Sequence, residues 1–249
     1  MESKPGTVHP LTQIINEAAR IFVDLGFEVA QGPEREDEWH NFDALNVPKD
    51  HPARDMQDTF YIKPTRISET GGNNPGQLLR THTSNTQIRY MEDLVKAGKT
   101  PPFEIVVPGK VFRNEATDAT HEMQFHQIEG LMIGTDVNMS HLKGVLLEFF
   151  KRFLGPETEI RFRPSFFPFV EPGVEVDLKV TNSVTGESKW VEVLGAGMVH
   201  PNVLKNCGID PDTYQGFAFG MGADRFLFMK YGLTDIRPAY QGDLRLNQF

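Results

Sequence analysis

The fold is decided by two stretches of sequence, Lys110-Val111-Phe112-Arg113-Asn114-Glu115 and Gln124-Phe125-His126-Gln127-Ile128-Glu129-Gly130, with mostly polar residues 116–123 between them. Their apolar and aromatic content predicts two strands joined by a loop. Because side chains alternate along a strand, Phe125, Gln127 and Glu129 share one face. An unpaired buried carboxylate is costly, so we expect Glu129 to meet a cation or a ligand ammonium, unless this row simply faces solvent.

Apolar residues elsewhere recur with periods that predict several helices and further strands. Strands that follow one another with few helices between them indicate the α+β class, an antiparallel β-sheet flanked by helices. Helices are expected at 11–25, 84–95, 142–153 and 223–231, and strands at 27–30, 103–107, 110–114, 124–133, 159–163, 174–181, 189–194 and 215–220.

Two segments near the N-terminus lack a sustained period. Residues 34–38 are acidic, and we expect them to be solvated. Residues 39–76 contain four prolines and the pair Gly71-Gly72, which predicts a long loop region. Loops of this length inside a compact domain are usually functional.

Composition bounds the class of protein. The 249 residues suit one large domain or two small ones. Lys and Arg number 25 against 34 Asp and Glu, and the net charge of −9 excludes a generally basic nucleic-acid binder. No run approaches the roughly 18 apolar residues of a membrane helix, and Met1-Glu2-Ser3-Lys4-Pro5-Gly6 lacks an apolar signal core. We therefore expect a cytoplasmic protein without a membrane partner.

Several motifs resemble known sites but fail on spacing. Gly98-Lys99-Thr100 resembles the end of a phosphate loop, but the required earlier glycine is Asp93. His121 and His126 are five residues apart instead of the four of a zinc-binding helix, so we interpret His126 as a hydrogen-bonded structural histidine. The single cysteine, Cys207, lies in a predicted turn and excludes a disulfide framework and a cysteine-based zinc cluster.

A glycine-rich strand precedes the last predicted helix. It reads Gln215-Gly216-Phe217-Ala218-Phe219-Gly220-Met221-Gly222, and Arg225 lies in the first turn of the helix. Glycines allow a ligand to approach the backbone closely. A guanidinium plane can stack on a flat base and pair with phosphate.

Taken together, these segments resemble the class II aminoacyl-tRNA synthetases, and among them the α subunits of bacterial phenylalanyl-tRNA synthetases. Motif 1 corresponds to about 9–33, motif 2 to about 110–133 and motif 3 to about 215–232. The resemblance implies a single catalytic domain over residues 1–249. Four further stretches are typical of the family: 39–46, 81–84, 167–172 and 194–201.

The resemblance implies roles for the nucleotide-binding residues. Arg113 matches the motif 2 arginine that grips the α-phosphate of ATP. Phe125 and Arg225 match the groups that sandwich the adenine. Glu115 and His121, in and beside the motif 2 loop, match residues that reach the adenine and the phosphates.

The resemblance also implies an amino-acid site. Gln127 and Glu129 match the residues that receive the substrate ammonium, and Phe167 and Phe169 match rings that meet the substrate phenyl group edge to face. The remaining members are Trp39, His82, Ser84 and Gln87 near the ammonium, and Val170 and Ala218 at the far end of the ring.

The implied reaction is activation of L-phenylalanine by ATP to the adenylate, followed by transfer to tRNA(Phe). Glu171 matches a carboxylate assigned to Mg²⁺, and Glu192 is expected as a second ligand. The implied partner is the β subunit, with which the family forms a heterotetramer. The family's N-terminal coiled-coil arm has no counterpart here, so we expect the surface that grips tRNA to lie elsewhere. Where the family usually has a proline after 81–84, this chain has Asn85-Thr86.

Two other functions stay open from the sequence. One is a regulatory protein that binds an amino acid or a nucleotide without aminoacylation; the other is a synthetase for another amino acid.

The first predicted helix allows two interpretations of its apolar stripe. Its apolar stripe suggests a homodimer through motif 1, with core packing in one chain as the competing reading; the stripe comprises Ile14, Ile15, Ala18, Phe22 and Leu25.

Overall fold

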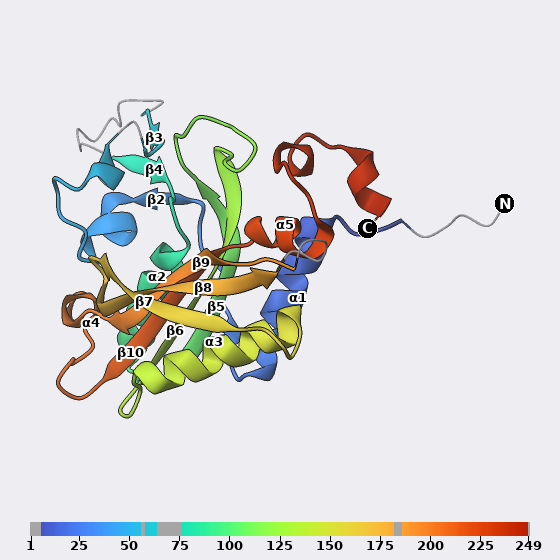
Figure 1. Ribbon diagram of the computed structural model, residues 1–249. Helices are drawn as coiled ribbons and strands as arrows, with labels where there is room; N and C mark the ends of the chain where they lie inside the picture. Colours follow the sequence, from blue (N-terminus) through green and yellow to red (C-terminus); the bar gives the residue numbers. More distant parts are fainter. Residues whose placement is uncertain (1–5, 56–57, 64–75, 182–185, 249) are drawn as a thin grey trace.

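The computed structural model describes residues 6–55, 58–63, 76–181 and 186–248, and a seven-stranded sheet forms its centre (Figure 1). The strands are β1 Glu28–Val29, β5 Phe103–Phe112, β6 Gln124–Gly134, β7 Ile160–Phe167, β8 Val170–Thr181, β9 Ser188–Val199 and β10 Gln215–Gly222. Their order across the sheet is β1-β5-β6-β10-β9-β8-β7. All neighbours are antiparallel except β1 and β5, which run parallel.

Helices and a small second sheet complete the fold. The helices are α1 Pro10–Asp24, α2 Ser84–Lys96, α3 Met139–Leu154, α4 Pro201–Asn206 and α5 Arg225–Tyr231. The small sheet has the order β2-β4-β3, from Arg35–Asp37, Gln77–Leu79 and Tyr61–Ile62. The short helices are η1 Trp39–Asp43, η2 Pro52–Arg54, η3 Arg237–Ala239 and η4 Leu244–Gln248. The predicted α+β class is confirmed.

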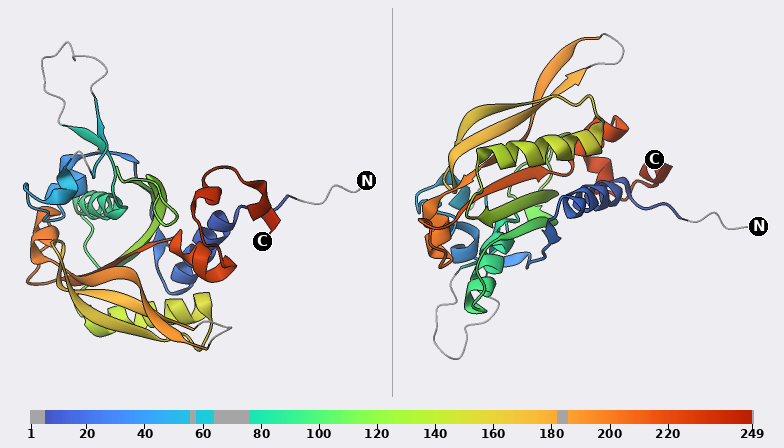
Figure 2. Two further views of the ribbon diagram at one scale, coloured as in Figure 1. Left: turned by 45° about the horizontal axis from the view of Figure 1, so that its top comes forward. Right: turned by 90° about the horizontal axis from the view of Figure 1, so that it is seen from below.

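The large sheet separates two hydrophobic cores. Along β5, Val106 joins the core that contains α1, α3 and α5, whereas Ile105 and Val107 join the core that contains α2. This alternation follows from the two-residue period of a strand. Figure 2 shows the sheet curving around α2, with α1 and α3 on its outer side. The α2 side is also the face of Glu129 and Leu131, so α2 is placed against the polar row of β6.

The apolar stripe of α1 is core packing within one chain. Ile14, Ala18 and Phe22 have no exposed surface, and Phe22 stacks on Phe149 of α3 with ring centroids 4.4 Å apart. Core packing, the competing reading, therefore accounts for these residues, because α3 and α5 already cover them. A homodimer through motif 1 stays a prediction. Ile15 and Leu25 are partly buried against the same core.

Two other expectations need correction, and one helix was not predicted. The strands expected at 103–107 and 110–114 form one continuous strand, β5, which pairs with β6 along its whole length. Pro108 does not interrupt it, because β1 pairs with β5 only at Ile105 and Val106 and Pro108 lies on a free edge. A strand edge tolerates the missing N–H of proline. Helix α4 has only six residues, too few to show a helical period in the sequence. Within the acidic segment 34–38, Glu36 is buried rather than solvated, and Arg89 and Asn85 of α2 donate hydrogen bonds to it at 2.5–2.8 Å.

The structure describes only part of the loop region expected at 39–76. Of the loop region expected at 39–76, residues 56–57 and 64–75 fall outside the described residues, including Gly71-Gly72. The described part of that region contains η1, η2 and β3. Among the helices that the structure describes, none combines the length and the apolarity needed to cross a bilayer.

Gly130 on β6 provides a test of the outer core. A Cβ atom added there would lie 2.2 Å from the Phe219 ring, which cannot yield because it packs against Phe22 and Phe27. We expect Gly130→Ala to lower the free energy of unfolding by about 1–3 kcal/mol, the usual cost of overpacking. Chemical denaturation measures this change.

Gly144→Ala is the matched control. Gly144 lies in the exposed face of α3 with no atom within 4 Å of an added Cβ, so the substitution should be neutral or stabilise the helix by up to about 1 kcal/mol. Equal unfolding midpoints for Gly130→Ala and the parent chain would show that Phe219 is not confined as described.

Candidate active site

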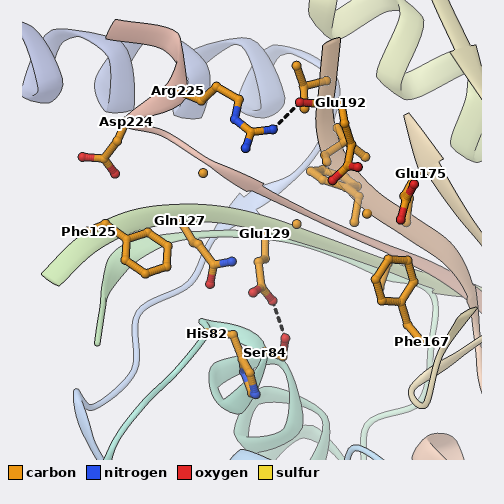
Figure 3. A pocket seen from close by; sticks show the side chains of 18 of the residues that line it. His82, Ser84, Phe125, Gln127, Glu129, Phe167, Glu175, Glu192, Asp224 and Arg225 are labelled. Carbon is orange, nitrogen blue, oxygen red and sulfur yellow. Dashed lines mark hydrogen bonds between the residues drawn. The ribbon is translucent and has the colours of Figure 1, made fainter. Parts of the chain in front are cut away.

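A cavity of about 1320 Å³ lies on the α2 side of the sheet, against β6 and β10 (Figure 3). Its lining includes the predicted row of β6, so Phe125, Gln127 and Glu129 do share one face and that face meets a cavity rather than bulk solvent. The other predicted residues in its lining are His82, Ser84, Gln87, Arg113, Glu115, His121, Phe167, Phe169, Val170, Glu192, Ala218 and Arg225.

Glu129 is a buried carboxylate at the base of the cavity. Its side chain accepts hydrogen bonds from Thr83 N at 3.2 Å, Ser84 Oγ at 2.5 Å and Gln87 Nε2 at 3.1 Å. These donors lie at the start of α2, so the helix N-terminus surrounds the carboxylate with neutral donors. Burial raises the pKa of Glu129 to about 7, although Ser84, Thr83 and the charge of Arg113 oppose the rise. A bound cation would favour the ionised form further.

Two further acceptors near this carboxylate lack hydrogen-bond partners. Within the described part of the chain, His82 Nδ1 and Gln127 Oε1 are buried and unpaired. The other ring nitrogen of His82 lies 2.9 Å from the Asn41 carbonyl oxygen, which can only accept, so Nε2 carries the proton. Desolvation lowers the His82 pKa to about 4, which keeps the ring neutral and leaves Nδ1 as an acceptor.

These three groups define what the base of the cavity can bind. Glu129, Gln127 and His82 all offer acceptor atoms, and a ligand with several N–H donors satisfies them together. An ammonium group has three such donors and a positive charge. Thr83, whose backbone N–H binds Glu129, was missed by the sequence reasoning because a backbone donor leaves no side-chain signal.

The predicted adenine and phosphate residues surround the opposite part of the cavity. The Arg113 guanidinium lies over the Phe125 ring, 5.0 Å from its centroid, and Arg113 Nε donates to Thr81 O at 3.2 Å. Arg225 is exposed at the start of α5 and donates to the carbonyl oxygen of Glu192. His121 lies on the exposed loop between β5 and β6, where Asp118 accepts from its ring at 3.0 Å.

The apolar part of the cavity lies where β7 turns into β8, opposite the middle of β10. The Phe167 and Phe169 rings are 5.8 Å apart and inclined by 21°. Room for Phe167 comes from Gly195 on β9, where an added Cβ would lie 2.8 Å from the ring. Val170 and Ala218 line the same cavity. The predicted aromatic pocket residues are thus brought together.

Two predicted site residues lie outside the cavity lining. Trp39 is 41% exposed, and its indole nitrogen donates to Glu92. The Glu171 side chain is 76% exposed and lies 3.5 Å from His200 Nε2. The structure therefore does not bring either residue to the other members of the predicted site.

Carboxylates that suit a magnesium ion do line the cavity. Glu192 lines it together with Glu175, which the sequence reasoning missed, and Arg163 lies 3.7 Å and 2.9 Å from them. Oxygen ligands of this kind fit Mg²⁺, which usually keeps several waters and binds one or two carboxylates with substrate phosphates. The one described cluster of three metal-type ligands, Glu36, Asp37 and His40, lies outside the cavity lining.

Comparisons with known proteins agree with this geometry. The family model described as "tRNA synthetases class II core domain (F)" matches residues 1–249. A phenylalanine–tRNA ligase alpha subunit of Dehalococcoides mccartyi is 53% identical over 251 residues, covering 98% of this chain and 70% of the relative. Alpha subunits of Xanthomonas campestris pv. campestris and Caldicellulosiruptor bescii are 49% and 51% identical, each covering 98% of this chain and 69% of the relative. The chain therefore belongs to the phenylalanine–tRNA ligase alpha subunits of the class II tRNA synthetase family.

Proposed function

We propose that this chain activates L-phenylalanine with ATP to phenylalanyl-adenylate and transfers the phenylalanyl group to tRNA(Phe). The observation that carries the proposal is the set of acceptors at the base of the cavity, Glu129, Gln127 and His82, beside an apolar recess. Phenylalanine presents an ammonium and a phenyl ring in that arrangement. We further propose that residues 1–249 act as one catalytic domain.

Formation of the adenylate requires the protein to bind the two substrates and to stabilise negative charge. Attack of the substrate carboxylate on the α-phosphate accumulates negative charge in the transition state. Arg113 and Arg225 can stabilise that charge without a protein nucleophile. A bound magnesium ion would supply positive charge beside the phosphates, and Glu192 with Glu175 would hold it. The exposed position of Glu171 gives that residue less support. Glu115 and His121, on the loop beside Arg113, are proposed to contact the nucleotide.

The apolar recess bears on the choice of amino acid. Phe167, Phe169, Val170 and Ala218 contribute no side-chain hydrogen-bonding group to it. A charged or phosphorylated substrate would lose its hydration there without compensation. This favours phenylalanine over the alternative of a synthetase for a polar amino acid. A regulatory protein that only binds its ligand is the second candidate function. Such a protein would show no pyrophosphate exchange, whereas an enzyme would show exchange that is lost when Arg113 is removed.

Partners follow from the same proposal. The names of the relatives specify an alpha subunit, and we propose a β subunit as the partner, with tRNA(Phe) as the second substrate and the cytoplasm as the compartment. The net charge of −9 supports a tRNA-gripping surface outside this chain. The α1 stripe gives no support to a homodimer, since its apolar residues lie in the core of one chain.

Replacing Arg113 tests the phosphate role. Arg113→Ala should reduce phenylalanine-dependent pyrophosphate exchange by about 10²–10³-fold, the effect of removing one donor at a developing charge. Arg113→Lys should rescue poorly, because a point charge replaces a planar fork. The control is Arg152→Ala, which removes an exposed ion pair with Glu148 on α3 and should leave exchange unchanged. Near-normal exchange in Arg113→Ala would refute the assignment.

The pH dependence of binding tests Glu129. Its pKa of about 7 means that phenylalanine affinity should fall about tenfold between one pH unit above and one below that value, as the carboxyl becomes protonated. Arg113 stays charged over that range, as guanidinium groups do in proteins, and His82, with a pKa of about 4, stays neutral. Glu129→Gln should abolish this dependence and weaken phenylalanine binding by about 1.5–3 kcal/mol with little effect on ATP. Calorimetric titration measures both ligands, and equal losses for ATP and phenylalanine would assign Glu129 another role.

Replacing Ala218 tests the end of the recess. Ala218→Gly removes the methyl group that we place at the para position of the substrate ring, so para-chlorophenylalanine should become a substrate. Phenylalanine itself should lose only about 1 kcal/mol of contacts. Tyrosine should gain less, since its hydroxyl would be desolvated without a partner at about 1–3 kcal/mol. An unchanged ratio of chloro-analogue to phenylalanine in steady-state adenylation would mean that Ala218 only packs the strand.

A further inference from the structure

The segment that follows α5 lies against the loop between β5 and β6 (Figures 1 and 2). Ile236 N donates to Ala119 O of that loop at 2.9 Å, and the Ile236 side chain is 2% exposed. Thr234 and Ile236 line the same cavity as the proposed nucleotide residues. The C-terminal segment, residues 233–240, is therefore part of the cavity wall.

Tyr240 joins this segment to two other elements. Its hydroxyl donates to Asp224 Oδ1, and Asp224 Oδ2 accepts from the backbone N of His126 at 2.7 Å. The Tyr240 hydroxyl also lies 3.1 Å from His126 Nδ1, and the two rings are stacked with centroids 6.2 Å apart. His126 thus has the structural, hydrogen-bonded role expected from the sequence.

The residues in this network are neighbours of the two groups proposed to hold adenine. His126 directly follows Phe125 on β6, and Asp224 directly precedes Arg225 at the start of α5. The Ala223 N donates to His126 O at 2.8 Å, which fixes the two backbones against each other. A shift of Asp224 would therefore change the position of Arg225 relative to Phe125.

Asp224 needs its donors. It is 4% exposed, and burial raises its pKa to about 6 although Tyr240 and the His126 amide oppose the rise. Without the Tyr240 hydroxyl, the Asp224 carboxylate would keep only backbone donors. It would then be less firmly held beside the part of the cavity where we propose that the nucleotide binds. In Figure 3 the Asp224 carboxylate and the Arg225 guanidinium extend in opposite directions from the start of α5.

We propose that Tyr240 is a positioning residue for the nucleotide, which holds Asp224 and thereby sets the separation of Arg225 from Phe125. The inference rests on the proposed function for the identity of the ligand, ATP. The competing view is that Tyr240 only fastens the C-terminal segment. The two views differ in whether the loss of one hydroxyl affects ATP selectively.

The test is Tyr240→Phe in the full chain, with Tyr90→Phe as the matched control. Tyr90 also donates its hydroxyl to a carboxylate, Glu28, but outside the cavity lining. In pyrophosphate exchange, Tyr240→Phe should raise the KM for ATP about three- to tenfold, the scale of one hydrogen bond, with the KM for phenylalanine and kcat unchanged. Tyr90→Phe should change neither KM. Hydrogen–deuterium exchange should become faster at 118–121 and 223–226 in Tyr240→Phe alone.

Asp224→Asn provides a second variant that keeps an acceptor for Tyr240. The effects of Asp224→Asn and Tyr240→Phe on the KM for ATP should be non-additive in the double variant, because both act through one contact. An unchanged KM for ATP in Tyr240→Phe, or equal rises for ATP and phenylalanine, would overturn the proposal. If the parent chain shows no exchange activity either alone or with the proposed β subunit, the proposed function fails. Unchanged amide protection at 118–121 and 223–226 would separately refute the link that Tyr240 makes.

Discussion

The desolvated carboxylate of Glu129 is the constraint on which the rest of the site depends. Its burial is tolerated because Thr83, Ser84 and Gln87 at the start of α2 supply three hydrogen bonds, and removing such partners from a buried charge is costly. Those donors reach it only if α2 docks on β5 and β6. Space for the side chain also requires a glycine on the neighbouring strand, since a Cβ at Gly220 would lie 3.1 Å from Glu129 Cγ. The sheet register and the position of α2 are thus tied to one functional group.

The two faces of the sheet have different tasks. On the outer face, Phe22 stacks on Phe149 and Phe219, and this aromatic core supports β10 from behind. On the inner face, the same strands present Glu129, Gln127 and Ala218 to the cavity. Alternation along β6 and β10 separates the two sets of residues. Rigid packing behind the strands is what allows unpaired acceptors such as Gln127 Oε1 to be held in place in front of them.

Much of this arrangement could be predicted from the sequence, because it rests on local periodicity and short motifs. The face shared by Phe125, Gln127 and Glu129 follows from alternation alone, and α1 and α3 follow from their apolar spacing. Contacts between distant segments could not be predicted. Glu36 was expected in solvent, yet Asn85 and Arg89 donate hydrogen bonds to it and bury it. The departure at Asn85-Thr86 does not move Gln87 away, since Gln87 still reaches Glu129. Trp39 and Glu171 match family motifs, but their exposure depends on tertiary packing that a motif does not encode.

The central claim is that an acceptor-rich base beside an apolar recess selects phenylalanine for activation by ATP. Pyrophosphate exchange with each of the twenty amino acids, on the chain alone and with the proposed β subunit, tests it most directly. The account predicts exchange with phenylalanine well above every other amino acid, and no exchange with the analogue that lacks the ammonium. Preferred exchange with a polar amino acid, or phenylalanine binding without exchange under both conditions, would contradict it.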